Sequence, residues 1–509
     1  MNKKISSTIL AAALLAGSTV CSFSGNAAAE TVPSPESQAS KESKENSSRK
    51  LVSAAVSGDL NAVKTLIAAG ADVNFRDQYD GRTALFWAAA QGNLDIVNAL
   101  IDAKADVNLH TIEGSTALLA ASAGGHLEVV KALLGANASI DARGYGGPTA
   151  LMMAALNCRA DVVRFLIGAK ADVNARSNDG STVLMSAAYC ENMDVVQAIL
   201  GAKIDIRAKN DKGQTALMMA AAQGNLNMVN ALIKAKSDVK SRSKDGSTAL
   251  MAACRGGHAE AAKALIKAGS DVNARSSDGT TALLAAAESG DAEVVRGLLQ
   301  ARAKVKDKND KGQTALILAA FHQKSPDIIR LLIKEKSDIN GSSNDGTTAL
   351  MAAAVSGHAE AVKALIDAKA DVNARGEQGL TALMAAAAGG NAEIIKILLG
   401  AKADVNAVDD FDRTALIWAA KVSQKEAVKA LIDAKADVDV KTKEGKTALD
   451  EAADYEIVRI LLRAGKKDGE NGGASSNPGE AGNIGKAGNI GNSGNSADSE
   501  KKESGKVIP

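Results

Sequence analysis

Residues 379–406 read GLTALMAAAAGGNAEIIKILLGAKADVN, and close copies of this stretch fill most of the chain. Thr381 lies two residues after Gly379 and is placed to cap, through its hydroxyl, a short helix over residues 383–388. A pair of glycines then ends that helix. A second helix is predicted over residues 391–399, where isoleucines and leucines form a broad apolar face. The stretch therefore predicts two antiparallel helices followed by a turn.

The Thr-Ala-Leu triplet of this stretch recurs every 33 residues, with a single step of 34. The extra residue of the long step falls at 321–326, in a loop between two helices. A leading unit, residues 51–74, lacks the threonine but keeps the rest, so we predict thirteen units in residues 49–465. One unit cannot bury its own apolar face, and neighbours must stack into a continuous core. The triplets begin at Thr83, Thr116, Thr149, Thr182 (as Thr-Val-Leu), Thr215, Thr248, Thr281, Thr314, Thr348, Thr381, Thr414 and Thr447.

The composition agrees with a core of closely packed helices. Of 509 residues, 46% are apolar, yet there are only six phenylalanines, four tyrosines and two tryptophans. Small aliphatic side chains must therefore supply the buried area that aromatic residues supply in most globular domains. Sixty Lys and Arg against 59 Asp and Glu leave a net charge of +1. This balance provides no bulk field for nucleic acid or an anionic membrane, and we expect neither as a partner.

These motifs resemble the ankyrin repeat. The family pattern joins a hairpin tip with glycine, a Thr-Pro-Leu-His helix start, a Gly-His between the helices, a Val-Val/Leu-Leu second helix and a closing Gly-Ala-Asp-Val-Asn. The resemblance implies an all-α solenoid with β-hairpin loops, of about thirteen 33-residue units, whose concave side carries the first helices and the hairpins. Matching residues are Gly257-His258-Ala259-Glu260, Val129-Val130, Leu133-Leu134 and Gly70-Ala71-Asp72-Val73-Asn74.

The sequence departs from the family pattern at three places. Alanine usually replaces the proline of the helix start. The histidine that follows, which ties neighbouring repeats by hydrogen bonds in the family, becomes an apolar residue, so apolar packing is expected to replace those bonds. The glycine that ends the second helix is usually lysine, which predicts strain in a left-handed cap. Examples are Met152, Leu284 and Ile417 for the histidine, and Lys104, Lys170, Lys369 and Lys435 for the glycine.

The two ends of the chain differ from its repetitive middle. Residues 1–29 have two early lysines, a short apolar run and an Ala-Ala-Ala before Glu30, which predicts a signal peptide and export to the periplasm. A lipoprotein signal with Cys21 as the lipidated residue is the alternative, and secretion is another. Residues 30–48 and 466–509 lack packing residues, and we expect a disordered linker and a disordered Gly/Ser/Asn-rich tail. No segment of the mature chain is long and apolar enough to span a membrane.

No catalytic, cofactor or metal-binding motif is evident, and we expect neither enzymatic activity nor a cofactor. His126, His258 and His358 lie between the helices and belong to the repeat pattern, whereas His110 and His322 lack ligand partners at metal-binding spacing. Cys158 and Cys190 lie in consecutive units. Stacked helices are about 8–10 Å apart, whereas a disulfide needs α-carbons about 4.4–6.8 Å apart. This comparison argues against a bridge, although the sequence leaves the pairing open.

Two sets of residues are candidates for binding a partner. A basic residue recurs two positions after each unit's closing Asn, and we interpret it either as a ridge for an acidic partner or as a ladder of ion pairs between hairpins. We favour the ladder because the net charge is near zero. The ridge candidates are Arg143, Arg176, Arg242 and Arg275. The second set comprises aromatic and basic residues that break the pattern at hairpin tips and at first-helix ends. These are Tyr79, Tyr145, Tyr189, Arg255, Phe321, Phe411 and Lys421; for Trp87 and Trp418 we favour core packing.

The sequence thus predicts a monomeric, non-enzymatic scaffold that is exported and binds protein through its concave face. Two other functions fit the same features. One is a secreted effector or surface factor acting on a host or neighbouring cell. The other is an accessory protein to a periplasmic enzyme. The identity of the partner is outside what the fold implies.

Overall fold

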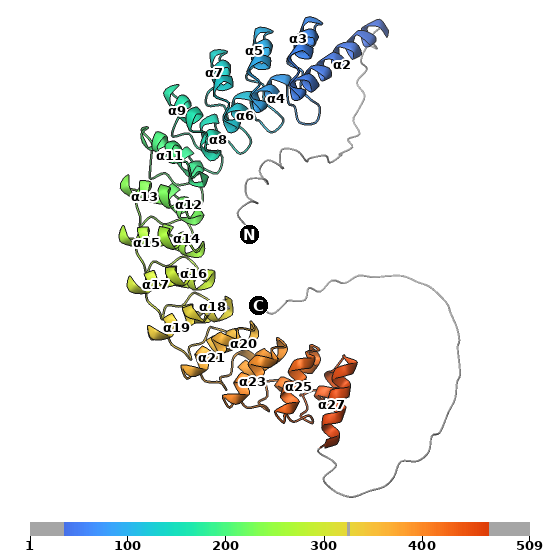
Figure 1. Ribbon diagram of the computed structural model, residues 1–509, viewed down its shortest axis with the longest axis vertical. Coiled ribbons are helices and arrows are strands. Elements are labelled where there is room, and N and C mark those ends of the chain that lie inside the picture. Colours follow the sequence, from blue (N-terminus) through green and yellow to red (C-terminus); the bar gives the residue numbers. More distant parts are fainter. Residues whose placement is uncertain (1–34, 323–325, 468–509) are drawn as a thin grey trace, which may run out of the picture.

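A computed structural model describes residues 35–322 and 326–467. In these ranges the chain is helical and contains no β-strand. Thirteen pairs of helices stack side by side into a curved row (Figure 1). The predicted signal peptide with Cys21, and the predicted tail beyond Lys467, lie outside the described residues. Among the described helices, none has both the length and the hydropathy needed to cross a bilayer.

The first helix of each pair lines the inside of the arc and the second lies outside it (Figure 1). We number the pairs as units 1–13. The inner helices are α2 (Pro35–Ser57), α4 (Ala84–Gln91), α6 (Ala117–Gly124), α8 (Ala150–Leu156), α10 (Val183–Ser186), α12 (Ala216–Gln223), α14 (Ala249–Arg255), α16 (Ala282–Ser289), α18 (Ala315–His322), α20 (Ala349–Val355), α22 (Ala382–Ala388), α24 (Ala415–Lys421) and α26 (Ala448–Glu451). The outer helices are α3 (Leu60–Ala68), α5 (Leu94–Asp102), α7 (Leu127–Gly135), α9 (Ala160–Gly168), α11 (Met193–Leu200), α13 (Leu226–Lys234), α15 (Ala259–Lys267), α17 (Ala292–Gln300), α19 (Asp327–Lys334), α21 (Ala359–Asp367), α23 (Ala392–Gly400), α25 (Lys425–Asp433) and α27 (Tyr455–Lys467).

The repeated threonine starts the inner helices of units 2–13, as predicted. In unit 11 the Thr381 hydroxyl accepts a hydrogen bond from the backbone N–H of Met384 at 3.3 Å, which satisfies one of the free donors at the helix start. The inner helices then bury almost every side chain. Leu383 and Met384 are each 1% exposed, and burial of such a side chain stabilises the fold by about 1.5–3 kcal/mol. The alanines let neighbouring inner helices approach closely.

The outer helices bury only one face. In α23, Ile394, Ile395 and Leu398 are buried, while Glu393 is exposed. Apolar packing also replaces the histidine of the family pattern, because Met152, Leu284 and Ile417 are nearly fully buried. The stack is therefore one continuous aliphatic core, and its aromatic content is as small as the composition suggested.

The predicted strain at the ends of the outer helices is confirmed. Lys104, Lys170, Lys369 and Lys435 all have left-handed backbones with φ of 63–69°. Gly70 and Gly269 occupy the same place in two other units, with φ of 80° and 87°. A residue with a Cβ atom is strained in this conformation, whereas glycine is not.

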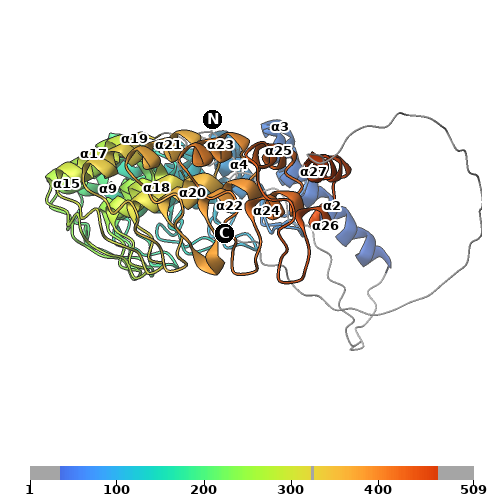
Figure 2. The same ribbon diagram turned by 90° about the horizontal axis from the view of Figure 1, so that it is seen from below.

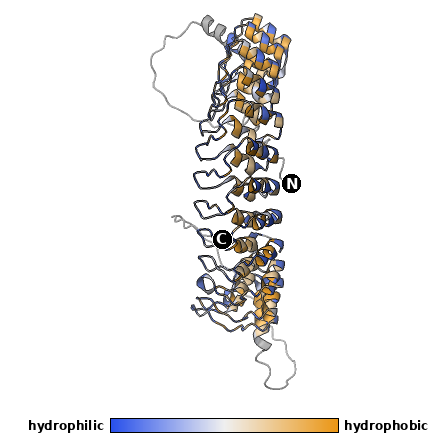
Figure 3. Ribbon diagram, turned by 90° about the vertical axis from the view of Figure 1, so that its left-hand side faces the viewer, coloured by the Kyte–Doolittle hydropathy of each residue, from blue (hydrophilic) through white to orange (hydrophobic). Residues whose placement is uncertain are grey.

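A two-armed loop, here called a finger, precedes each threonine; residues 341–347 are the finger of unit 10. The fingers stand off the inner helices along one side of the stack (Figures 2 and 3). In unit 10 the Ser343 N–H donates to the Thr347 carbonyl at 3.0 Å and closes the finger. The predicted hairpins are thus present as fingers, but among the described residues they show only three isolated β-bridges, at His110–Thr116, Lys308–Thr314 and Ser342–Thr348.

The N-terminal boundary differs from the prediction. Helix α2 begins at Pro35, inside the stretch expected to be a disordered linker over residues 30–48. Ser48 is 1% exposed, and its hydroxyl accepts a bond from the Asp72 N–H at 2.9 Å. Arg49 pairs with Glu45 one turn earlier, at 2.8 Å. The polar composition misled the prediction, because the buried residues of α2 lie toward its C-terminal end, at Ser48, Leu51, Ala54 and Ala55.

The C-terminal unit has polar residues at places that are apolar in other units. Asp450 forms a capping box with Thr447, in which each side chain bonds the other's backbone N–H. Glu451 is 13% exposed and pairs with Lys421 and Lys446, both at 3.3 Å. These residues close the last inner helix after four residues and leave a polar end on the stack.

Candidate functional site: the concave face and its fingers

The fingers are joined to one another by their backbones. In each of units 5–13, the finger tip donates a backbone N–H to a carbonyl of the preceding tip, at 2.7–3.1 Å, so the fingers of units 4–13 are linked in one series. The bond between the Asp310 N–H and the Asp278 carbonyl is one example, at 2.9 Å. The fingers therefore form a continuous sheet-like edge, and their exposed side chains are held in a fixed register along the arc.

The recurrent basic residues tie the fingers together. Seven of them donate from the side chain to the backbone carbonyl of the equivalent residue in the next finger; the Arg76 guanidinium, for example, lies 2.8 Å from the His110 oxygen. Such charge-assisted bonds are stronger than neutral ones. The donor and acceptor pairs are Arg76 and His110, Arg176 and Lys209, Lys209 and Arg242, Arg242 and Arg275, Arg275 and Lys308, Lys308 and Ser342, and Arg375 and Val408.

This arrangement refines both interpretations of the basic ridge. The partners across fingers are mainly carbonyl groups, while carboxylates add weaker contacts at Arg275–Asp307 (3.8 Å) and Arg375–Asp410 (3.4 Å). Three of the four ridge candidates, Arg176, Arg242 and Arg275, thus hold neighbouring fingers. The fourth, Arg143, is exposed at the equivalent place in unit 4. A direct role of these four residues in binding stays a prediction.

Several fingers contain an aspartate clasped by its own loop. Asp179 accepts bonds from the Ser177 hydroxyl at 2.5 Å and from the Ser181 N–H at 3.1 Å. The Ser177 bond holds the pKa of this carboxyl below its ordinary value. Ser243 has the same effect on the pKa of Asp245, and Ser276 on that of Asp278. These carboxylates therefore remain negatively charged at neutral pH.

The pattern-breaking candidates are exposed but scattered along the arc. Tyr79 and Tyr145 project from the fingers of units 2 and 4, and each is 78% exposed. Tyr189 and Arg255 lie at the ends of the inner helical segments of units 5 and 7, also exposed. The structure brings these four residues into no common cluster.

The remaining pattern-breaking candidates lie in the C-terminal half. Phe321 is 37% exposed at the end of α18, and its ring contacts His322 edge-on at 4.9 Å. Phe411, 46% exposed, has the Arg413 guanidinium 4.6 Å from its ring centre. Lys421 is engaged with Glu451. Whether any of them binds a partner stays a prediction.

The two tryptophans are half-buried rather than fully packed in the core. Arg82 lies 4.8 Å from the Trp87 ring centre, and Arg413 lies 4.2 Å from that of Trp418. Both contacts are cation–π in type. The same arrangement thus occurs near each end of the stack, and each tryptophan positions an arginine at the base of a finger.

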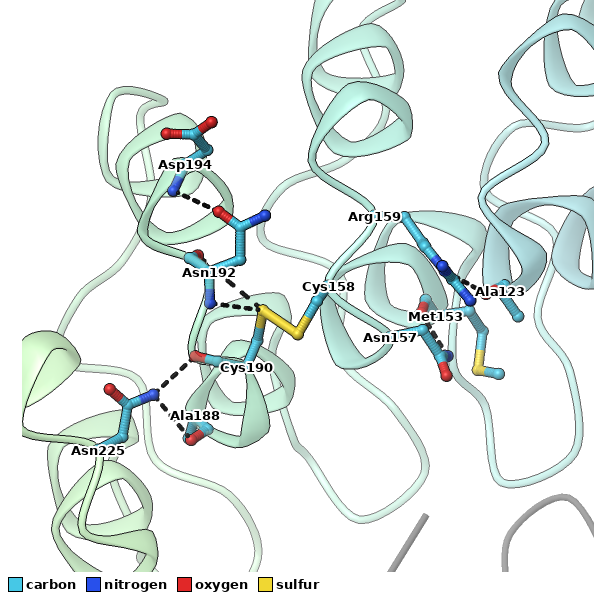
Figure 4. The surroundings of a disulfide bond; sticks show 10 residues. All are labelled: Ala123, Met153, Asn157, Cys158, Arg159, Ala188, Cys190, Asn192, Asp194 and Asn225. Atoms are coloured by element: carbon cyan, nitrogen blue, oxygen red, sulfur yellow. Dashed lines mark hydrogen bonds between the residues drawn. A yellow bond between two sulfur atoms is a disulfide. The ribbon is translucent and has the colours of Figure 1, made fainter. Parts of the chain in front are cut away.

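Cys158 and Cys190 form a disulfide, which the spacing argument had disfavoured (Figure 4). Their α-carbons lie 5.4 Å apart. The distance between helix axes does not apply to these residues, because neither cysteine lies within a helix. Cys158 follows α8 with φ of 62°, and Cys190 follows η1 (Ala187–Tyr189), the 3₁₀ turn that continues the short helix α10. The turns between helices approach each other more closely than the helices do.

A groove of about 610 Å³ lies on the concave side of units 8–11. Its floor contains Ile317, Leu318, Phe321, Met351 and Val355 from the inner helices. The wall beside this floor is formed by finger residues, which include Asp278, Asp310, Asp345 and Glu377. Of these residues, the sequence predicts only Phe321 as a binding residue. An excess of acidic residues at consecutive finger tips was the signal that could have found the rest.

Within the described residues, no cluster of His, Cys, Asp or Glu suited to a metal ion occurs. Burial raises the pKa of the Cys254 thiol, so this cysteine is unreactive. His126 and His258 each form a hydrogen bond with a carbonyl near the end of the inner helix of the preceding unit. The acceptors are Ala90 in α4, at 3.1 Å, and Ala222 in α12, at 3.0 Å. These histidines tie neighbouring units together.

The family comparison agrees with this architecture. No curated protein matches the chain. The family model described as Ankyrin repeats (3 copies) matches residues 51–144, 141–210, 192–276, 217–309, 283–376, 316–409 and 383–471. These overlapping matches run without a gap from residue 51 to residue 471, and they identify no catalytic family. Ankyrin repeats are generally non-enzymatic and suggest a scaffold for protein–protein interaction. The stacked helix pairs, the fingers and the continuous family match together show that the chain belongs to the ankyrin-repeat family.

Proposed function

We propose that this chain is an exported, non-enzymatic scaffold that binds a partner protein through its concave face. The observation that carries this proposal is the ladder of bonds between fingers. Backbone and side-chain bonds hold the exposed tips in register before any partner arrives. Little conformational entropy is then lost on binding, which favours affinity.

The disulfide supports export. Disulfides persist in oxidising compartments and are rare in the reducing cytosol. The Cys158–Cys190 bond therefore fits a protein that leaves the cytoplasm, as the predicted signal peptide also requires. Fractionation of cells that produce the chain tests this part. Recovery of the full-length chain with Met1 in the cytosolic fraction, with both cysteines reduced, would contradict export.

Cross-linking tests the scaffold. The purified chain is incubated with envelope extract, and cross-linked proteins are identified by mass spectrometry. The variant Y145A/Y189A/R255A removes three exposed concave-side groups. Y455A is the matched control, because Tyr455 is 73% exposed but lies on the outer helix α27.

The expected result is a specific protein that is captured by the parent chain and by Y455A and is depleted with the triple variant. Retention by all three chains would place the binding surface elsewhere. Failure to capture any specific protein from the envelope or from host-cell extract would contradict the scaffold function itself.

A further inference from the structure

We infer that the groove over units 8–11 binds an extended polypeptide segment in which basic residues alternate with apolar ones. The inference rests on the proposed scaffold function and names the chemistry of its partner. It is carried by three features of the groove: the apolar floor, the acidic wall and the length.

The floor offers exposed apolar surface in an otherwise bland inner face. Most inner-helix positions on this side are alanine, but Phe321 is the last residue but one of α18, and α20 ends with Val355, which is 43% exposed. Leu318 and Met351 lie beside them in the same groove. Exposed aromatic and aliphatic groups in a concavity are typical anchors for a partner's apolar side chains.

The wall is acidic. Five carboxylates line the groove, namely Asp278, Glu288, Asp310, Asp345 and Glu377, whereas Lys311 and His322 are the basic lining residues in the described part of the chain. The basic ridge residues of these fingers do not line the groove. They are Arg275, Lys308 and Arg375, and each donates to a carbonyl of the next finger. The local field of the groove therefore favours cations, although the whole chain is close to neutral.

The shape fits an extended chain. The lining residues run through four consecutive units, from Asp278 to Ala385. Helices packed about 8–10 Å apart make this span about 30 Å, and an extended chain covers it with about nine residues at about 3.3 Å each. Alternate side chains of an extended segment point to opposite sides. One set faces the apolar floor and the other set faces the acidic wall, so the occupant alternates apolar and basic residues.

The experiment measures fluorescence anisotropy of a labelled 12-residue peptide of alternating Lys and Leu, titrated with the purified full chain. Two comparison peptides carry Glu in place of Lys, or Ser in place of Leu. We expect the Lys/Leu peptide to bind at least ten-fold more tightly than either. Its affinity is expected to fall as salt rises from about 50 to 300 mM, because exposed charges are screened.

Variants place the site. D310N and E377Q each remove one charge from the wall, and F321S removes an anchor from the floor. We expect each to weaken binding about three- to five-fold, as loss of an exposed charge pair or a partly exposed anchor does. D211N is the matched control, because Asp211 occupies the same finger-tip position as Asp310 but lies in unit 6, outside the groove. Thermal unfolding followed by circular dichroism checks that all four variants are folded.

Several results would overturn the inference. If D211N weakens peptide binding as much as D310N does, the attraction is diffuse and there is no specific site. If F321S leaves the affinity unchanged, the apolar floor does not contact the peptide. Displacement of the probe by a peptide copying residues 498–509 would assign the groove to the chain's own tail. Self-association abolished by F321S would assign it to a second copy. If a cross-linked partner is captured equally by D310N, E377Q and F321S, the groove is not its site, yet the scaffold function stands.

Discussion

The α-carbons of Cys158 and Cys190 lie 5.4 Å apart, and a disulfide joins units 4 and 5 through these residues. This bond is covalent, whereas the other links between units in the described part of the chain are hydrogen bonds, ion pairs and aliphatic packing. Each unit of a repeat stack contacts only its neighbouring units, so a local link acts mainly on the two units it joins. The disulfide therefore strengthens one particular joint of the arc.

We expect the variant C158S/C190S to be less stable than the parent chain. The two cysteines are 32 residues apart, and closing a loop of that size in the unfolded chain stabilises the fold by about 3–4 kcal/mol in the chain-entropy description. Urea unfolding followed by circular dichroism measures the loss. Hydrogen exchange is expected to rise most in units 4 and 5, where the joint is released.

C254S is the control for the disulfide, because Cys254 is buried and unpaired. Tryptic digestion without reductant should yield peptides 144–159 and 177–203 linked to each other. Recovery of these peptides as separate free thiols from protein purified under oxidising conditions would contradict the bond.

The second prediction concerns the lysines at the ends of the outer helices. K104G and K369G should each raise the free energy of unfolding by about 0.5–1 kcal/mol. Glycine adopts the left-handed backbone without the penalty of about 1–2 kcal/mol that other residues bear, although part of the gain is offset because the unfolded chain becomes more flexible. Thermal unfolding of each variant measures the change.

K369A separates backbone strain from charge, because alanine removes the charge but keeps the Cβ atom. We expect K369A to give no stabilisation, and G269K to destabilise the chain by an amount similar to the gain from K369G. Equal stabilisation by K369A and K369G would trace the effect to the lysine charge instead.

Much of the fold was predictable because it is repeated. The threonine cap, the buried Leu383 and the left-handed Lys369 recur at fixed steps, and a recurring residue reports a recurring environment. The ends of the stack were harder to predict. Residues 35–48 look like a polar linker, since a terminal unit has only one neighbouring unit and needs fewer apolar residues than an inner one.

The binding surface was less predictable than the fold. The exposed aromatics were recognised as exceptions to the pattern, but the groove arises from where four units come together. In the sequence, Asp310 and Glu377 look like any other finger residues. Only the stacking of the units places them in one groove with Phe321. The bonds of Arg176 and Arg242 to carbonyls were also missed, because backbone acceptors leave no mark in the sequence.

The clasped aspartates predict the response to acid. Serine bonds lower the folded-state pKa of Asp179, Asp245 and Asp278 below the unfolded-state value of about 3.9. Their contribution to stability is therefore fully present above about pH 4 and is lost as pH falls through the lowered values. We expect the variant S177A/S243A/S276A to lose less stability between pH 5 and pH 2 than the parent chain does. Urea unfolding at pH 5, 4, 3 and 2 tests this.

The control variant S139A carries one serine-to-alanine change where no such clasp exists, and it should keep the parent's dependence on pH. A parallel loss of stability with falling pH in the triple variant and in the parent would mean that other carboxylates dominate acid unfolding.

The last prediction concerns Asp409 and Trp418. The side chain of Asp409 is fully buried and accepts bonds from Arg413 at 2.7 Å and from the indole N–H of Trp418 at 3.0 Å. The backbone N–H groups of Phe411 and Arg413 donate to the same carboxylate, both at 2.9 Å. One buried acid therefore satisfies four donors at the base of the finger of unit 12.

We expect D409A to destabilise the C-terminal units by about 2–3 kcal/mol, because removal of the acid leaves a partly buried arginine charge and several donors without their acceptor. In a W87F background Trp418 is the single tryptophan, so its emission reports unit 12. The emission should shift to longer wavelength in D409A, since the indole gains contact with water, and urea unfolding at this probe should occur at a lower urea concentration.

D80N in a W418F background is the matched control at the other end, where Asp80 pairs with Arg82 at 3.1 Å and is itself partly exposed. A smaller effect is expected there, because water can replace an exposed acid but not a buried one. Equal effects at the two ends would show that burial of Asp409 adds nothing to its role.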